Sequence, residues 1–181
     1  MLSQFNDSQG RKTLKSLAKF PKDVYSIGRL DMDSEGLILL TNDSELNHRL
    51  TDPKFEHPRT YLVQVERLPS LRAVEQLRDG VTIQGKKTKR AEVQLLDSEP
   101  DFPPRTPSIR YRKNVPTAWI QITLREGRNR QIRKMTAAVG HPALRLIRTA
   151  IGQLLLGDLK VGESRCLSER EIRDLKSSVG V

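Results

Sequence analysis

Alternating hydrophobic positions along the chain predict its β-strands. Tyr61, Val63 and Val65 occupy every second position of residues 60–67, the period expected when one face of a sheet is buried. Residues 118–124 alternate in the same way. Shorter hydrophobic runs predict further strands at residues 24–30, 37–41, 81–83, 91–96 and 144–150. We expect the strands at 81–83 and 91–96 to form a hairpin around Gly85.

Hydrophobic positions three to four residues apart predict the helices, and capping residues mark where the helices begin. Asp43 is the expected N-cap of one short helix, and Ser168 and Glu171 form a capping-box pattern that opens a terminal helix. Another helix is expected between Ser70 and Gly80. The helix after Asp43 is expected at residues 44–50, and the remaining predicted helices lie at residues 8–20 and 129–139.

The order of these elements indicates the fold class. Several predicted strands follow one another through short turns, without a steady β-α-β alternation. This order favours an α+β fold with a mixed, mainly antiparallel sheet and flanking helices. Residues 97–107 contain four prolines and predict an exposed loop. The 181 residues are expected to form a single domain.

Positive charge is concentrated in one quarter of the chain. The net charge is +10, and residues 105–148 hold eleven Lys/Arg residues against one acidic residue, Glu126. The rest of the chain is balanced, with twenty-one residues of each sign. A segment whose charged residues are nearly all positive is more typical of a surface that binds a polyanion, such as a nucleic acid, than of a surface that only faces solvent. No hydrophobic run approaches a membrane span, so we expect a soluble, cytoplasmic protein.

Cysteine, histidine and acidic residues give little support for metal or disulfide chemistry. Cys166 is the one cysteine, which excludes an internal disulfide, and the three histidines lack metal-binding spacing. Acidic residues at 31, 33 and 35 imitate the opening of a calcium-binding EF-hand loop. The twelfth position of such a loop is Asn42 here, where a calcium site needs a glutamate. We therefore expect no metal site.

The same acidic turn is a candidate site for chemistry. Taken alone, the acidic turn is most simply explained as a solvated polar turn between two strands. Arg29 and Asp31 are two positions apart, however, and would point in the same direction if the preceding strand extended that far. A carboxylate beside a guanidinium stays ionised and oriented, as a nucleophile must be.

Two further segments are candidates for binding a nucleic acid. Tyr61 lies on a predicted strand, where it belongs either to the core or to a surface that stacks on a base. In the helix predicted at residues 129–139, Arg133 and Lys134 follow Arg130 by three and four positions, on the face opposite an apolar stripe. The turn before this helix offers backbone N–H groups that suit a phosphate. Arg128, Arg130 and Lys134 are therefore candidate contacts to the RNA backbone, with an idle solvated helix as the alternative.

Three stretches together resemble the RsuA family of bacterial ribosomal-RNA pseudouridine synthases. They are YSIGRLDMDSEGLILLTND at residues 25–43, residues 59–65, and TLREGRNRQIRKMTAAVGHPALRLIRTAIG at residues 123–152. The resemblance covers nearly the whole chain, and the combination of its motifs is highly specific. It implies a pseudouridine-synthase fold with a central RNA-binding cleft, as a single catalytic domain over residues 1–181.

The resemblance also implies roles for individual residues. Asp31 matches the catalytic aspartate, and Arg29 matches the neighbouring arginine that helps hold the flipped nucleotide. Tyr61 matches the tyrosine that stacks on the target uracil. Arg133 matches the basic residue that ion-pairs with the catalytic aspartate, and Leu146 matches an apolar position lining the uracil pocket.

Some features of the family are not found in this sequence. We expect no S4-type RNA-binding domain, which many members have. The sequence starts just after the place of the Asn-Lys-Pro-containing strand that usually opens the catalytic domain, so either the sequence is shortened or another segment replaces that strand. Arg59 stands where many relatives have lysine, which keeps the charge.

The implied reaction converts a uridine of 23S rRNA to pseudouridine, with an aspartate nucleophile acting on a flipped-out base. We expect no cofactor and no metal, and a monomer whose partner is ribosomal RNA, without a membrane. Two alternatives are a non-catalytic ribosomal-RNA-binding or ribosome-assembly protein and a synthase acting on small-subunit rRNA. The acidic turn argues against the first, because a pure RNA binder does not need carboxylates near its phosphate-binding face.

Overall fold

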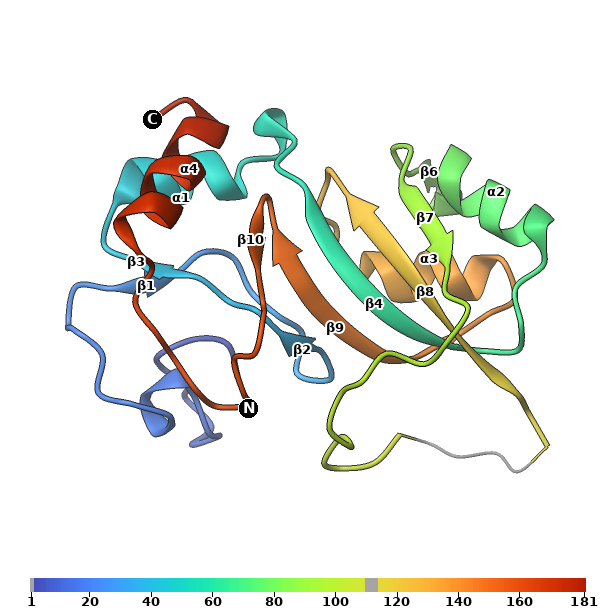
Figure 1. Ribbon diagram of the computed structural model, residues 1–181, viewed down its shortest axis with the longest axis horizontal. Coiled ribbons are helices and arrows are strands. Elements are labelled where there is room, and N and C mark those ends of the chain that lie inside the picture. Colours follow the sequence, from blue (N-terminus) through green and yellow to red (C-terminus); the bar gives the residue numbers. More distant parts are fainter. Residues whose placement is uncertain (1, 110–113) are drawn as a thin grey trace. The chain divides into compact units, whose positions relative to one another are not determined.

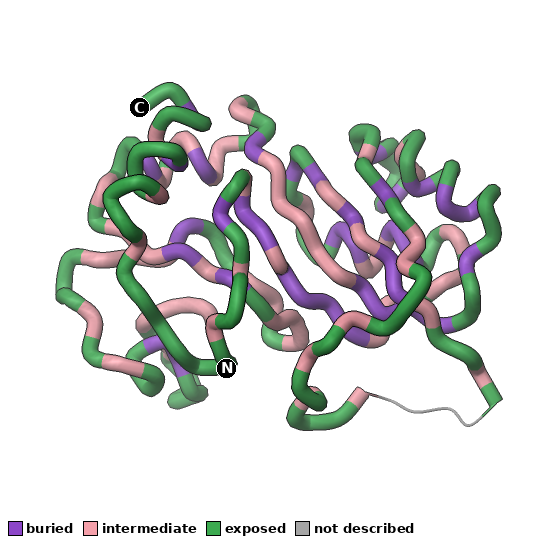
Figure 2. Tube along the Cα trace, viewed as in Figure 1, coloured by how far each residue is buried: buried purple, intermediate pink, exposed green. Residues whose placement is uncertain are grey.

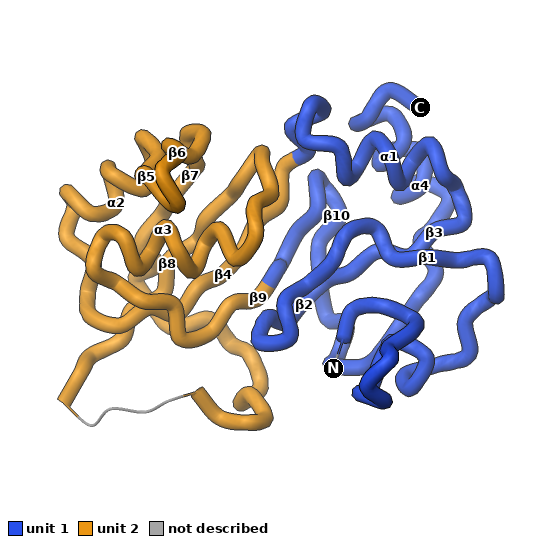
Figure 3. The backbone as a smooth tube through the Cα atoms, turned by 180° about the vertical axis from the view of Figure 1, so that it is seen from behind, with its two compact units in different colours: residues 1–57, 148–181 blue, residues 58–147 orange. Residues whose placement is uncertain are grey.

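The computed structural model describes residues 2–109 and 114–181 and divides into two compact units (Figures 1 and 3). Unit 1 contains residues 1–57 and 148–181, and unit 2 contains residues 58–147. Strand β9 (Ala143–Ile151) therefore begins in unit 2 and ends in unit 1. Three basic residues of the predicted basic segment, Arg110, Arg112 and Lys113, lie outside the described residues. The expectation of a single catalytic domain stays a prediction.

Unit 2 is built on long strands with alternating sequences. Strand β8 (Thr117–Leu124) pairs antiparallel with both β4 (Arg59–Glu66) and β7 (Glu92–Leu95), and β4 also pairs with β9. In the register of β4 and β8, Tyr61 lies opposite Ile122 and Val63 opposite Ile120. The strands predicted at 60–67 and 118–124 are thereby confirmed, and the structure shows that they are neighbours in one sheet.

The core of unit 2 forms where this sheet meets two helices. Helix α2 (Leu71–Asp79) contributes Val74 and Leu77, and helix α3 (Gln131–Ala138) contributes Ile132 and Met135, to the same buried cluster as the sheet residues. Figure 2 shows the buried positions running along these strands. Each fully buried aliphatic side chain stabilises the unit by about 1.5–3 kcal/mol relative to an exposed one. This combination of sheet and helices confirms the predicted α+β class.

Unit 1 has short strands and helices around its own core. Strand β1 (Tyr25–Ser26) pairs antiparallel with β3 (Leu40–Thr41), β10 (Leu154–Leu155) pairs antiparallel with the end of β9, and β2 (Glu35–Gly36) also pairs with β9. Helices α1 (Ser44–Thr51) and α4 (Glu169–Val179) close this core, and a short 3₁₀ helix follows α1 at Pro53–Phe55. The buried residues of the cluster are Ile27, Leu37, Leu39, Leu46, Leu50, Ile151, Leu154, Leu175 and Val179.

The predicted helix caps are confirmed. The Asp43 carboxylate accepts a hydrogen bond from Leu46 N, and this bond and the ammonium of Lys176 lower the pKa of Asp43. Ser168 and Glu171 form the expected capping box. The hydroxyl of Ser70 caps α2, and Gly80 follows the last residue of that helix with φ +84°.

Two predictions of local structure are wrong. Residues 8–20 do not form an α-helix; only the 3₁₀ helix Leu14–Ser16 occurs there, because the Asp7 carboxylate binds the backbone N–H groups of Gln9 and Arg11 and Gly10 adopts φ +69°.

The hairpin partner was also misassigned. Strand β5 (Thr82–Ile83) pairs with β6 (Lys86–Lys87), because Gln84 and Gly85 both have positive φ and make a two-residue turn, while β7 pairs with β8.

Among the described residues, no helix is long and apolar enough to cross a lipid bilayer.

Candidate functional site

The acidic turn of unit 1 follows the short strand β1. Ser34 N donates to Asp31 O over 2.9 Å, which closes the turn, and Asp31 is partly buried while Arg29 is exposed. The strand predicted to carry both side chains on one face stops at Ser26, so that part of the prediction is wrong. Gly28 has φ +65°, a conformation that ends extended backbone before Asp31 is reached.

The backbone before Asp31 is fixed by a side chain from the beginning of the chain. The Ser3 hydroxyl accepts a hydrogen bond from Leu30 N at 2.8 Å and donates one to Leu30 O at 2.9 Å. One hydroxyl therefore satisfies both backbone groups of the residue next to Asp31.

The backbone after the acidic turn is fixed by β9. Leu37 N donates to Arg148 O at 2.9 Å, and the Arg148 guanidinium Nε donates back to Leu37 O at 2.7 Å. Gly36 lies so close to this strand that a Cβ atom there would be 2.2 Å from Arg148 O. The turn that carries Asp31 is thus anchored on both sides, and the second anchor requires a glycine.

Tyr61 and Leu146 lie in unit 2. Leu146 is only 6% exposed and belongs to the hydrophobic cluster of that unit, against which the partly buried Tyr61 packs. Both side chains therefore contribute to packing. Base stacking by Tyr61 and contact of Leu146 with uracil stay predictions.

The start of α3 differs from the predicted helix. Gln131 is the first helical residue, and Arg130 precedes the helix with φ +51°. Arg130 consequently does not share a helical face with Arg133 and Lys134, as was predicted. The reason is local: Gln131 Oε1 accepts a hydrogen bond from Arg128 N at 3.0 Å, which closes the turn with a side chain before the helix begins.

Arg133 and Lys134 make different contacts on α3. Arg133 donates to Ala143 O at 3.2 Å. The Lys134 ammonium donates to Asn129 O, Asn129 Oδ1 and Gln84 Oε1 at 2.8, 3.0 and 2.9 Å. The amine of Lys134 is therefore held beside the turn that precedes the helix.

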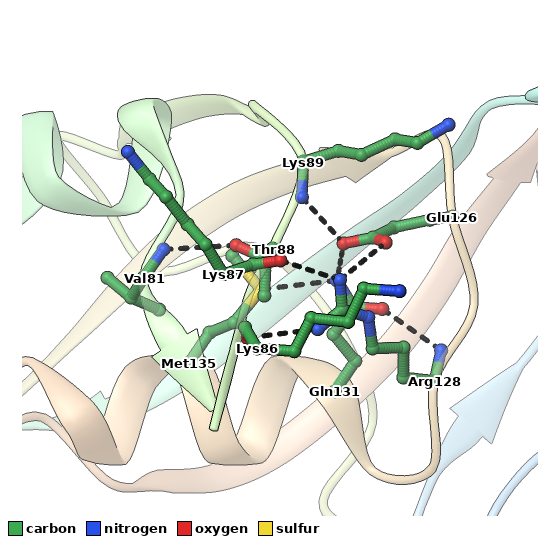
Figure 4. A network of polar contacts seen from close by, with 9 residues as sticks. All are labelled: Val81, Lys86, Lys87, Thr88, Lys89, Glu126, Arg128, Gln131 and Met135. Atoms are coloured by element: carbon green, nitrogen blue, oxygen red, sulfur yellow. Dashed lines mark hydrogen bonds and ion pairs between the residues drawn. The ribbon is translucent and has the colours of Figure 1, made fainter. Parts of the chain in front are cut away.

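A buried polar network joins this turn to the β5–β6 hairpin (Figure 4). The Glu126 carboxylate, in a residue that is 9% exposed, accepts hydrogen bonds from Lys89 N at 2.8 Å and Gln131 Nε2 at 2.7 Å. Arg128 lies 3.2 Å from the same carboxylate and donates to the carbonyl oxygens of Lys86 and Lys87 at 3.1 and 2.7 Å. Arg128 thus has structural contacts, and its predicted contact to RNA stays a prediction.

The candidate residues divide between the two units. Arg29 and Asp31 belong to unit 1, and the other six belong to unit 2. Within unit 2 the structure brings Arg128, Arg130 and Lys134 together around one turn. Within residues 2–109 and 114–181, no group of three or more His, Cys, Asp and Glu side chains is arranged to hold a metal ion.

Sequence reasoning missed the residues that connect the hairpin to this turn. Lys86, Lys87 and Lys89 were counted in the balanced part of the chain, although residues 84–90 contain four basic residues and no acidic one. A charge count over short windows would have found them. The role of Glu126 had no such signal, because its contact with Lys89 joins residues 37 positions apart. The contacts of Gln131 with Arg128 and Glu126 are local but follow no periodicity.

Comparison with known proteins agrees with the motifs. The pattern of the RNA pseudouridylate synthase family matches residues 2–138. The chain is 52% identical over 161 residues to "Ribosomal large subunit pseudouridine synthase E" of Xanthomonas axonopodis pv. citri, covering 88% of this chain and 84% of that protein. It is 50% identical over 162 residues to the protein of the same name in Vibrio parahaemolyticus, covering 90% and 67%.

A solved crystal structure of a pseudouridylate synthase has the same fold. Its TM-score is 0.76 at 31% sequence identity, and the match covers 90% of this chain and 65% of that chain. The pseudouridine-synthase fold implied by the sequence motifs is therefore confirmed. The chain belongs to the RNA pseudouridylate synthase family.

Proposed function

We propose that this enzyme isomerises a uridine of large-subunit ribosomal RNA to pseudouridine. The observation that carries the proposal is the identity of half or more of the aligned residues to two proteins named as large-subunit synthases. The substrate also accounts for the positive charge of the chain, since ribosomal RNA is a polyanion. We place the enzyme in the cytoplasm, the compartment of bacterial ribosomal RNA.

The reaction rearranges bonds without adding or removing atoms from the nucleotide. The N1–C1′ bond of uridine breaks, the uracil turns, and a C5–C1′ bond forms. The proton on C5 is lost to solvent and N1 gains one. An ionised aspartate assists by adding to C6 of the base or by attacking C1′, so the proposed mechanism requires no metal or other cofactor.

Asp31 is the proposed nucleophile. Its turn is anchored by Ser3 on one side and by β9 on the other, which suits a group whose carboxylate must be held in a fixed orientation. We assign Arg29 to the flipped nucleotide and Arg133 to the charge of the aspartate, as the family motifs imply.

The proposed contacts to the base and the backbone come from unit 2. We assign Tyr61 to stacking on the target uracil and Leu146 to the apolar wall of its pocket. Stacking compensates part of the few kcal/mol needed to unstack a base. Arg130 and Lys134 are assigned to RNA phosphates, with Arg128 adding fixed positive charge beside them. We propose that one copy of the chain is sufficient.

The test is release of tritium from RNA labelled at C5 of uridine. Purified protein is incubated separately with unmodified 23S and 16S ribosomal RNA transcripts. We expect release from 23S RNA alone, limited to a single uridine. Release from 16S RNA instead would assign the enzyme to the small subunit, and no release from either, as naked RNA or as assembling particles, would contradict the proposed substrate.

A further inference from the structure

The β5–β6 hairpin carries positive charge that the family motifs do not include. Residues 84–90, QGKKTKR, hold Lys86, Lys87, Lys89 and Arg90 without an acidic residue, and all four are exposed. None of the large exposed hydrophobic side chains among the described residues belongs to this segment. The surface is therefore charged without an apolar anchor, which suits a phosphate backbone better than a lipid bilayer or a protein hot spot.

The hairpin lies against the start of α3, although about forty residues separate them in sequence. Gln84 Oε1 accepts a hydrogen bond from the Lys134 ammonium at 2.9 Å. The Arg128 guanidinium donates to the carbonyl oxygens of both residues of β6. These contacts lie within unit 2, so the charges of the hairpin and of the turn before α3 belong to one surface.

The hairpin is held rigidly by the network in Figure 4. A pair of two-residue strands is not stable by itself in water. Here Lys89 N is bound to the buried carboxylate of Glu126, and the hydroxyl of Thr88, a residue 5% exposed, accepts a hydrogen bond from Val81 N. The side chains of Lys87 and Lys89 extend away from the network (Figure 4). Their backbone is thus ordered before any ligand binds, which lowers the entropy lost on binding.

The hairpin charges differ in how they are balanced. Arg90 lies 3.1 Å from the carboxylate of Asp79, and the charge of Arg128 is balanced by Glu126. In the described part of the chain, the ammonium groups of Lys86 and Lys87 make no ion pair. Figure 4 shows the two side chains leaving β6 in different directions, so each ammonium is available to a separate phosphate.

We propose that Lys86, Lys87 and Lys89, together with Arg130 and Lys134, form a hairpin surface that binds the phosphate backbone of the substrate RNA away from the modified nucleotide. Arg128 is a positioning residue of this surface, because it joins the hairpin to the turn. The inference rests on the proposed function only in that the bound polyanion is RNA.

The test compares three proteins on an unmodified 23S ribosomal RNA transcript. They are the wild type, the double variant Lys86→Gln/Lys87→Gln, and the control Arg170→Gln/Arg173→Gln, which removes the same charge from exposed arginines that already lie beside acidic residues. Each lost phosphate contact reduces the slope of log Kd against log salt by about 0.7–0.9. We therefore expect the hairpin variant to lower this slope by about 1.5 and to raise Kd at 0.1 M salt about tenfold or more.

The readouts separate this inference from the proposed function. At saturating RNA, single-turnover pseudouridine formation by the hairpin variant should match the wild type, because the lysines do not touch the reacting base. Restoring the charges as Lys86→Arg/Lys87→Arg should recover both Kd and slope. An unchanged slope, or an equal change in the control, would overturn the hairpin surface even in an active enzyme. Failure of the wild type to modify 23S RNA would contradict the function and leave the binding comparison readable.

Discussion

The two units organise their chemistry in different ways. Unit 2 rests on two eight-residue strands and gathers cations around a buried carboxylate, so its charged surface is built from contacts inside one unit. Unit 1 has strands of two residues and places its acidic turn between anchors from distant parts of the sequence. The difference teaches that binding charge can be supported by a continuous sheet, whereas an oriented carboxylate is supported by a few specific backbone contacts.

Removing the carboxylate of the acidic turn should have the largest effect on function. Asparagine has the size of aspartate but is neutral and a poor nucleophile, so Asp31→Asn should reduce pseudouridine formation to background. RNA affinity should change less than about tenfold, roughly 1.4 kcal/mol, because loss of an anion does not weaken polyanion binding greatly. Tritium release and filter binding measure the two effects.

The matched control is Asp33→Asn in the same turn, which should keep near-normal turnover. Full turnover by folded Asp31→Asn would assign the nucleophile to another residue and remove the basis for contrasting the acidic turn of unit 1 with the basic surface of unit 2.

A methyl group at the second anchor of the acidic turn should destabilise unit 1 strongly. Gly36 has φ +101°, and a Cβ atom would lie 2.2 Å from Arg148 O. Gly36→Ala should therefore cost about 3 kcal/mol or more and lower Tm by roughly 10 °C. In unit 2, Gly85 also has positive φ, at +75°, but nothing lies within 4 Å of its Cβ position, so Gly85→Ala should cost only about 1 kcal/mol. Equal losses would mean that the close approach to β9 is not an anchor.

The buried carboxylate of unit 2 should contribute an intermediate amount. Glu126→Gln removes the negative charge that faces Arg128 and replaces one carboxylate oxygen by an NH2 group, which cannot accept a hydrogen bond. We therefore expect the free energy of unfolding, measured by chemical denaturation, to fall by about 1–3 kcal/mol. The control is Glu92→Gln, whose exposed side chain lies 3.5 Å from Arg125 and should cost less than about 0.5 kcal/mol. Equal losses of unfolding free energy in the two variants would mean that the Glu126 network does not hold the hairpin.

The smallest effect concerns the cap of α4 and depends on pH. The Arg165 guanidinium, followed by Ser168 N, lowers the pKa of Glu171 from 4.5 to about 2. A carboxylate with a lowered pKa stabilises the folded state fully above about 4.5, and this contribution is lost as the pH falls toward 2. Arg165→Gln should flatten that acid dependence of Tm, whereas Arg173→Gln, near Glu169 at 3.8 Å, should leave it as in the wild type. The same acid dependence in both variants would contradict this role of Arg165.

The prediction from the sequence was most successful for the long strands, where the alternation of hydrophobic and polar residues alone determines the structure. Val63 and Ile120 lie on long strands whose existence the alternating pattern predicted, whereas the pairing of those strands is seen only in the structure. The hairpin was assigned to the wrong strand because the turn depends on the left-handed conformation of Gln84, which is not a residue typical of it. The strand before Asp31 was extended too far because Gly28, read as part of a strand, instead turns the backbone.

The candidate site could be predicted as a set of residues but not as an arrangement. Motifs placed Asp31 and Arg130 in the set, whereas the turn before α3 depends on the side chain of Gln131, which acts on Arg128 and Glu126 through contacts that no periodicity records. The bond from Lys89 N to the Glu126 carboxylate joins residues 37 positions apart, and no pattern in the sequence marks that pair.

The passage of β9 from unit 2 into unit 1 has a consequence for synthesis on the ribosome. Residues 58–147 leave the exit tunnel before residues 148–181, so the nascent chain holds every residue of unit 2 while unit 1 still lacks Arg148 and α4. The acidic turn cannot gain its second anchor until the end of β9 has emerged. A growing chain therefore holds all of unit 2 before the turn that carries Asp31 gains its second anchor, so the proposed nucleophile is fixed in orientation only at the end of synthesis.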